Sequence, residues 1–486
     1  GMLIVLRAGL AECLDAPVLP PAWRDGLADT ADVLLEELHA AARRRSLDPD
    51  AIQRALRAVR GWRDALADAP PGLRDSLRLL DTLAADAAPL ADALAPDPET
   101  AFWRDALQAQ LDDLAGELRR FAPWAADDPS ALPDAARREL DTLPPLRALA
   151  TLHQRRESLL PPGTPGEDRW AGHFRLAAER AAERIAALNA LRDQCAELAD
   201  NDLDFLYDPK RHLLSIGYNL ESHLLDPGYY DLLASECRLA SFVGVARGQL
   251  PLEHWFHLGR RLAPGGGAPV LASWSGSMFE YLMPMLVMPS YDGTLLHETC
   301  RESVRRQIRY ARRAGIPWGI SESGYNQVDT HRIYQYRPFG IPTLGMKRGL
   351  ADDLVMAPYA AAMALMVAPR PAARNLRRLA ADGAVGRFGL YEAIDHTPAR
   401  VPAGEPFAIV RSWMAHHSGM SLLALDHLLL DRPMPRRFMA DPHLQSCLLL
   451  LQERIPLARP RARATAAVAE TAGGRSDDSV HPRSAR

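Results

Sequence analysis

The feature that most constrains the fold of this chain is a recurring pattern between Asn201 and Pro456. Helix-like segments there alternate with short loops that carry glycine, an aromatic residue and an acidic residue, about once every forty residues. Helical hairpins that stack side by side in a closed ring would bring all these loops to one end of the ring. The pattern therefore predicts an all-α fold with a single cleft lined by acids and aromatics.

One loop shows the pattern most clearly, W-G-I-S-E-S-G-Y at residues 318–325. Glu322 lies between two serines, and Trp318 and Tyr325 stand at the ends. Aromatic faces stack on sugars, serines offer hydrogen bonds, and a carboxylate can perform acid–base chemistry. A sugar pocket is one interpretation, and a polar turn that happens to contain Glu is the other.

Further acids occupy similar surroundings. Glu236 follows the small residues Ala234 and Ser235 in a helix expected over Tyr229–Gly248. Glu280 is embedded in an otherwise apolar helix that opens near Trp274, and ionised Glu is rarely buried without a partner. It therefore either faces a cavity or forms a salt bridge with one of the many arginines.

The last two loops carry Tyr391 with Glu392 and, at the start of a helix, His416 with His417. Adjacent histidines point in different directions, so the pair does not suit a helical zinc site. A histidine that hydrogen-bonds a substrate hydroxyl is the favoured interpretation.

The first two hundred residues have apolar positions at helical spacing, interrupted by proline-rich breaks. They predict a helical scaffold over residues 1–200 that leads into a catalytic region over 201–456, and residues 457–486 read as a disordered tail. The helices are expected at Ala31–Arg45, Ala51–Leu66, Leu73–Leu94, Ala101–Phe121, Leu146–Leu160 and Trp170–Asp200. Residues 205–217 predict a small β-hairpin around an Asp-Pro turn.

Composition removes several classes of function. A net charge of -4 with 48% hydrophobic residues argues against a nucleic-acid binder or a disordered chain. Five scattered cysteines form no C-x-x-C pair, which suits a reducing compartment such as the cytoplasm. The sequence holds no membrane-spanning run, no metal-ligand motif and no nucleotide or dinucleotide motif, so we expect no metal, no cofactor and no membrane contact by this segment.

Seven blocks, in one order, resemble the glucoamylase-like domain of cyclic β-1,2-glucan synthases. They are YYDLLASECRLASF (229–242), EHWFHLGR (253–260), SWSGSMFEYLMP (273–284), PWGISES (317–323), LGMKRGLADDLVMAPY (344–359), GLYEAID (389–395) and MAHHSGMSLLAL (414–425). The resemblance implies an (α/α)6 toroid that cyclises linear β-1,2-glucan by retaining transglycosylation. It also implies kinship with endo-β-1,2-glucanases.

Carried over by motif, Glu236 and Glu322 are the principal catalytic candidates, and Glu280 is a third. Asp231, Glu392 and His416 are expected to bind sugar, as are the aromatic residues Trp274, Trp318, Tyr325 and Tyr391. Serine hydroxyls and amides beside Glu322 would keep it ionised as nucleophile or base, whereas an apolar setting would favour protonated Glu236 as the acid.

The chain lacks the glycosyltransferase and phosphorylase-like parts of the full synthases, so it is either a fragment of a larger membrane-bound enzyme or a reduced homologue. Hydrolysis of β-1,2-glucan and non-catalytic glycan binding remain the alternatives to cyclisation.

Overall fold

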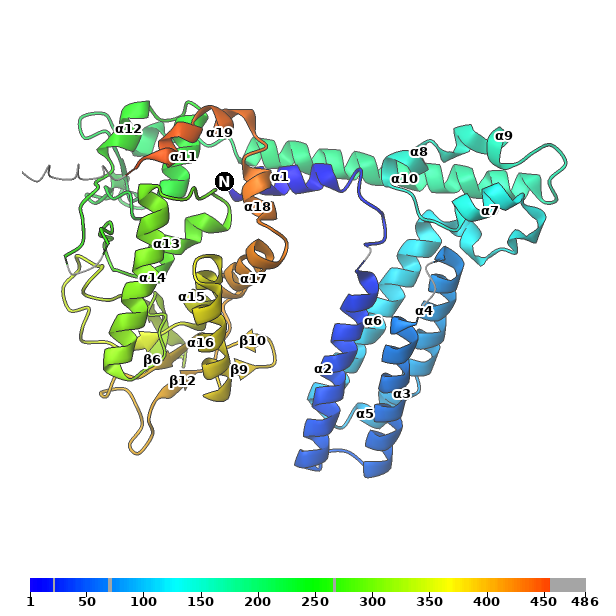
Figure 1. Cartoon of the computed structure of the whole chain (residues 1–486), viewed down its shortest axis with the longest axis horizontal. Coiled ribbons are helices and arrows are strands. Elements are labelled where there is room, and N and C mark those ends of the chain that lie inside the picture. The colour runs from blue at the N-terminus through cyan, green and yellow to red at the C-terminus, as the bar shows by residue number, and fades with distance from the viewer. Residues whose placement is uncertain (21, 69–71, 265–267, 455–486) are drawn as a thin grey trace, which may run out of the picture.

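The computed structural model describes residues 1–20, 22–68, 72–264 and 268–454, and most of these residues are helical. Figure 1 shows an N-terminal helical bundle beside a second body that holds the C-terminal half of the chain. Two helices, α1 and α10, run side by side between them. Two separate hydrophobic cores correspond to the two bodies, one built from residues between 23 and 181 and the other mainly from residues after 199.

The bundle forms from strongly amphipathic helices whose leucines meet in its centre. Its members are α2 (Trp23–Arg44), α3 (Pro49–Ala67), α4 (Leu73–Ala87), α5 (Leu90–Leu94) and α6 (Pro98–Phe121). Helices α3 and α6 begin in the same way: an aspartate, Asp48 or Asp97, accepts a hydrogen bond from an amide of the first turn, and proline follows it. This N-cap fixes where each helix starts. All the helices expected here are present, although the one predicted over residues 73–94 is divided into α4 and α5.

Short helices connect the bundle to α10 (Glu167–Leu198), the longest helix among the described residues. They are η1 (Pro123–Ala126), η2 (Pro129–Ala131), α7 (Asp134–Leu140), α8 (Leu146–Ala150), η3 (Leu152–Arg155) and α9 (Arg156–Leu159). The single helix expected over 146–160 is therefore three short ones. No helix in the described parts of the chain is both long and apolar enough to cross a bilayer.

The first helix, α1 (Met2–Glu12), packs with the C-terminal half although the bundle follows it in the sequence. Its Ile4 and Val5 belong to the second core, and Glu12 forms an ion pair with Arg437 on α18 (Pro433–Phe438). Boundaries near residues 200 and 456 remain predictions, and the predicted tail at 457–486 lies outside the described residues.

The second body consists of helix pairs. Helices α13 and α14, then α15 and α16, pack as neighbours, and α15 also contacts α13 and α17. The helices and helical turns are α11 (Arg238–Ala246), α12 (Leu252–His257), α13 (Met278–Leu282), η5 (Met283–Leu286), α14 (Leu295–Ala314), α15 (Pro358–Met363), η6 (Ala364–Met366), α16 (Pro369–Ala381), α17 (Ala415–Leu429), α19 (Pro442–Ser446) and η7 (Leu448–Gln452), with η4 (Asp204–Leu206) before them. Stacked helix pairs agree with the predicted class of fold, and closure into an (α/α)6 ring stays a prediction.

Short strands occupy the loops between these helices. They are β1 (Tyr207–Asp208), β2 (Leu213–Ser215), β3 (Tyr218–Asn219), β4 (Leu224–Leu225), β5 (Tyr229–Tyr230), β6 (Ser323–Val328), β7 (Tyr334–Arg337), β8 (Val355–Met356), β9 (Val385–Gly386), β10 (Gly389–Leu390), β11 (Ala393–Asp395) and β12 (Ala408–Val410). Antiparallel pairing of β1 with β2 confirms the hairpin predicted at 205–217.

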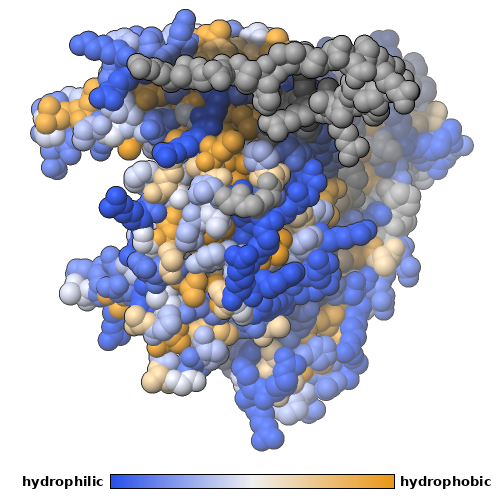
Figure 2. Space-filling view, turned by 60° about the vertical axis from the view of Figure 1, so that its left-hand side comes forward, coloured by the Kyte–Doolittle hydropathy of each residue, from blue (hydrophilic) through white to orange (hydrophobic). Residues whose placement is uncertain are grey.

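The helix predicted from Tyr229 is wrong over its first nine residues, since α11 begins only at Arg238. Tyr229 and Tyr230 pair with β2 instead, and this pairing takes the backbone hydrogen bonds that a helix would need. Figure 2 shows the second body from another side, where apolar residues lie among hydrophilic ones.

Candidate active site

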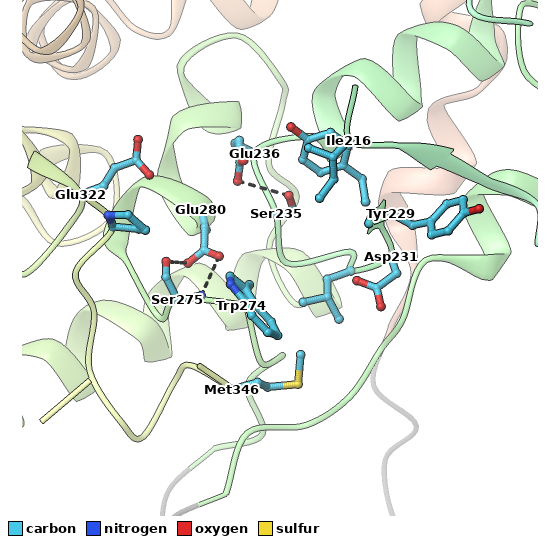
Figure 3. A pocket seen from close by; sticks show the side chains of 14 residues that line it. Ile216, Tyr229, Asp231, Ser235, Glu236, Trp274, Ser275, Glu280, Glu322 and Met346 are labelled. Atoms are coloured by element: carbon cyan, nitrogen blue, oxygen red, sulfur yellow. Dashed lines mark hydrogen bonds between the residues drawn. The ribbon is translucent and has the colours of Figure 1, made fainter. Parts of the chain in front are cut away.

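A cavity of about 440 Å³ collects acids from three separate elements. Glu236 lies in the turn before α11, Glu280 lies in α13, and Glu322 immediately precedes β6. Figure 3 shows these three carboxylates around one hollow, with Trp274 and Asp231 also on its wall. Trp274 is 60% exposed, so its indole offers a flat apolar face to a ligand. The structure thus brings together five of the predicted site residues.

Glu280 is held by its own loop. The hydroxyls of Ser273, Ser275 and Ser277 donate to its carboxylate, as do the amides of Ser275 and Ser277. Ser277 also accepts a hydrogen bond from the amide of Glu280, which completes a capping box at the start of α13. These donors, rather than an arginine, satisfy the buried carboxylate, so the salt bridge considered from the sequence is absent from its contacts.

The backbone at two glycines, Gly340 and Gly345, packs closely against the loop that carries Glu280. A Cβ at Gly340 or Gly345 would overlap the carbonyl oxygen of Ser275. Only a residue without a side chain allows the backbone after β7 to lie this close to the Trp274–Ser277 loop. The close approach fixes Trp274 and Glu280 relative to the cavity.

The carboxylate of Glu236 has fewer hydrogen-bond donors around it than that of Glu280. Burial raises the pKa of Glu236, and the charges of Glu280 and Glu322 raise it further. The backbone amide of Glu236 itself and the Ser235 hydroxyl, which donates at 3.2 Å, oppose the rise only in part. This environment favours the protonated acid, as the sequence predicted, although Glu236 precedes the helix instead of lying in it.

Glu322 has different partners from those expected. Ser321 hydrogen-bonds the hydroxyl of Tyr359 and the amide of Phe279, and the Ser323 hydroxyl has no partner. The carboxylate instead accepts a hydrogen bond of 2.9 Å from the Tyr336 hydroxyl. Burial raises the pKa of Glu322, while Tyr336 and the nearby His417 lower it in part. The serine solvation predicted for Glu322 is therefore wrong, because the loop turns both serines into the protein interior.

Two buried residues complete the surroundings of Glu322. Glu392 accepts hydrogen bonds of 2.9 Å from the amide of Gly324 and from Nδ1 of His417. Nε2 of His417 lies 3.4 Å from the Tyr336 hydroxyl. Glu392 was predicted to bind sugar, but both its oxygens already have protein partners. Sequence reasoning missed His417, although the adjacent pair 416–417 on a helix start was the available signal.

A second cavity, of about 260 Å³, adjoins this network. Tyr391, Glu392 and His417 line it, and the Tyr391 ring packs against Trp413 with centroids 4.9 Å apart. His416 is exposed beside Phe279 and lines neither cavity.

Two aromatic residues predicted to bind sugar lie away from both cavities. Trp318 is buried in the second core, where Asn375 hydrogen-bonds its backbone at both N and O. The Tyr325 ring lies 5.0 Å from the guanidinium groups of both Arg337 and Arg400. Their position follows from the backbone of residues 318–325, which runs inward before it enters β6.

Among the described residues, no three His, Cys, Asp or Glu side chains are grouped so that they could hold a metal ion. Independence of metal remains a prediction for the enzyme in solution.

Comparison with known proteins places the cavity in a matched region. Residues 228–441 match the Glycoamylase family model, described as "Putative glucoamylase". Over less than half of its length, the chain is similar to this family in a single matched region. All the residues of the two cavities except Ile216 fall within it.

A curated relative is the cyclic beta-(1,2)-glucan synthase NdvB of Rhizobium meliloti (strain 1021), 47% identical over 280 residues. The matched region is 56% of this chain and spans about a tenth of the relative, 10% of its length.

Two solved structures are similar at lower levels. The endo-beta-1,2-glucanase from Chitinophaga pinensis is 14% identical with a TM-score of 0.40, over 63% of this chain and 69% of that one. The beta-1,2-glucanase from Parabacteroides distasonis is 12% identical with a TM-score of 0.35, over 77% of this chain and 54% of that one.

Proposed function

We propose that the glucoamylase-like domain acts on β-1,2-glucan and cyclises linear chains by retaining transglycosylation, with Glu236 and Glu322 as its catalytic carboxylates. The convergence of Glu236, Glu280 and Glu322 on one cavity carries this proposal. A region of 280 residues in this chain is 47% identical to a cyclic β-1,2-glucan synthase, which supports the choice of substrate. Paired carboxylates at a cavity with an exposed Trp are the groups that glycoside chemistry requires.

Glu236 and Glu322 divide the work in this proposal. One carboxylate attacks or stabilises the anomeric centre, and the other exchanges a proton with the leaving and accepting oxygens. Glu280, whose oxygens are occupied by serine donors, holds the loop of Trp274 and contributes charge to the site. Trp274 stacks on a glucose ring, and Asp231 binds hydroxyls at the rim.

The test is a product analysis after incubation with linear β-1,2-glucan. Rings without a reducing end support cyclisation, whereas short linear products indicate an endo-β-1,2-glucanase, the second candidate. Glu236→Gln and Glu322→Gln should each lower kcat by at least about 100-fold while glucan binding persists, because the amide keeps the shape and loses the proton chemistry. Glu221→Gln, an exposed position outside the first cavity, is the matched control.

Undiminished turnover in either cavity variant contradicts the assignment of that residue. Binding of glucan without turnover in the wild type would indicate a glycan-binding domain instead. We further propose that the chain works in the cytoplasm as part of a larger membrane-bound synthase, a role suggested by the length of its relative.

A further inference from the structure

A continuous line of hydrogen-bonding groups leads away from Glu322. The Tyr336 hydroxyl lies 2.9 Å from Oε1 of Glu322, and Nε2 of His417 lies 3.4 Å from that hydroxyl. On the other side of the imidazole, Nδ1 lies 2.9 Å from Oε2 of Glu392. The four groups come from the loop before β6, from β7, from α17 and from the turn before β11.

The chemistry of these groups gives the line two consistent states. Ionised Glu392 fixes a proton on Nδ1, so neutral His417 presents a free Nε2. In one state Glu322 is protonated and donates to Tyr336, which donates to Nε2. In the other state His417 is an imidazolium that donates to Tyr336, which donates to ionised Glu322. The Tyr336 hydroxyl has one proton, so its direction reverses between the two states.

We propose that Tyr336 and His417 form a proton relay for Glu322, an inference that rests on the function proposed above. In the outward step, the O–H bond of the Glu322 carboxyl breaks and its proton bonds to the Tyr336 oxygen. The original Tyr336 proton leaves at the same time and bonds to Nε2 of His417. The products are ionised Glu322, an intact phenol and a His417 imidazolium paired with Glu392.

The surroundings of His417 hold the imidazole in place for this exchange. Tyr359 stacks on the ring with centroids 3.8 Å apart and planes 15° apart, while its hydroxyl donates to the Glu322 carbonyl. The titratable side chains facing the imidazole are Glu392, Tyr336, Tyr359 and, at a centroid distance of 5.8 Å, His416. Glu392 is the carboxylate in direct contact with the ring, and Glu322 acts on it through Tyr336, so both carboxylates stabilise an imidazolium.

The relay also lets the Glu322 proton leave while glucan is bound in the first cavity. Glucan bound in the first cavity would cover Glu322, whereas His417 lines the second cavity together with Ser418 and Ser421. Protons can therefore leave the network on the side away from the substrate. Such a device serves a carboxylate that gains and loses a proton in each cycle, as Glu322 does when it acts as the base.

The first experiment needs no substrate. The protein is labelled with ¹³C-histidine, and the His417 signal, assigned from the His417→Asn variant, is followed against pH. Because ionised Glu322 stabilises the imidazolium through Tyr336, the pH midpoint of the His417 signal should be lower in Glu322→Gln than in the wild type. Glu392→Gln should lower it as well. An unchanged midpoint in Glu322→Gln overturns the relay.

The second experiment measures turnover of linear β-1,2-glucan by Tyr336→Phe, which keeps the ring and removes the bridging hydroxyl. We expect kcat to fall about 100-fold with KM unchanged, and the pH profile to lose the limb that belongs to Glu322. Tyr334→Phe makes the same change two residues away on β7, at a tyrosine that lines neither cavity, and should leave the kinetics unchanged.

An unaltered kcat and pH profile in Tyr336→Phe overturns the relay even if the His417 midpoint moves. If the wild type turns over no β-1,2-glucan, the proposed function fails, and the His417 titration alone then decides the relay.

Discussion

The three glutamates of the first cavity differ in the hydrogen-bond donors that their carboxylates have. Glu280 accepts hydrogen bonds from several serine hydroxyls and amides, whereas Glu236 accepts from its own amide and one hydroxyl, and Glu322 from one phenol. Burial raises the pKa of both Glu236 and Glu322, so each costs stability when it ionises in the folded protein. Residues that function requires in an unfavourable environment are common at active sites.

Because ionised Glu236 and Glu322 destabilise the folded protein, their Gln variants should gain stability in a pH-dependent way. As the pH rises past the unfolded glutamate pKa of about 4.3, the unfolded chain loses its proton first, and the free energy of unfolding falls until the raised folded pKa is passed. Glu236→Gln should therefore be more stable than the wild type at pH 7, and the difference should vanish near pH 3.5. Urea unfolding at both pH values measures it. Equal stability at pH 7 would contradict the burial argument, and exposed Glu221→Gln provides the reference.

At the scale of elements, the first cavity depends on loops that are held by close backbone contacts. The Trp274–Ser277 segment lies against Gly340 and Gly345, and the capping box of Ser277 and Glu280 joins it to α13. A loop held at both ends in this way can keep Trp274 exposed without making it mobile.

Gly340→Ala tests this clamp. The added methyl group would collide with the Ser275 carbonyl, which is backbone and cannot turn aside. We expect a loss of about 2–3 kcal/mol in unfolding free energy and a larger loss of turnover than of stability. Gly419→Ala in α17, where a Cβ meets nothing within 4 Å, should be neutral or slightly stabilising. Wild-type turnover in Gly340→Ala would show that the clamp is dispensable.

At the scale of the whole molecule, two hydrophobic cores are joined by α1 and α10 (Figure 1). Arg387 adds a further contact, because its guanidinium pairs with Glu99 at the start of α6 and lies 4.0 Å from the Phe102 ring centroid. Few side chains thus connect the bundle to the loops around the second cavity, so the two bodies should unfold separately.

Calorimetry should accordingly resolve two transitions. Leu80→Ala, at a fully buried position of the first core, should lower the midpoint temperature of one transition, and Phe242→Ala in the second core should lower that of the other. Each substitution should reduce the unfolding free energy of its own body by about 3–5 kcal/mol. Linear β-1,2-glucan should raise only the transition that Phe242→Ala lowers. Leu191→Ala, half-exposed on α10, serves as the control. A single transition shifted by both core variants would contradict independent unfolding.

The sequence by itself determined what depends on local pattern. Apolar spacing and proline-rich breaks placed the bundle helices, and loops with acid, aromatic and glycine marked Glu236, Glu280 and Glu322 as neighbours of one cavity. Only the tertiary structure decided which groups meet across the chain. Glu392 and His417 lie 25 residues apart, and Tyr336 and His417 lie 81 apart. Pattern within a segment cannot reveal such pairs, because the packing of α15, α17 and the β6–β7 hairpin sets them. The same packing turned Trp318 and the two serines beside Glu322 into the interior, away from the chemistry that their sequence suggested.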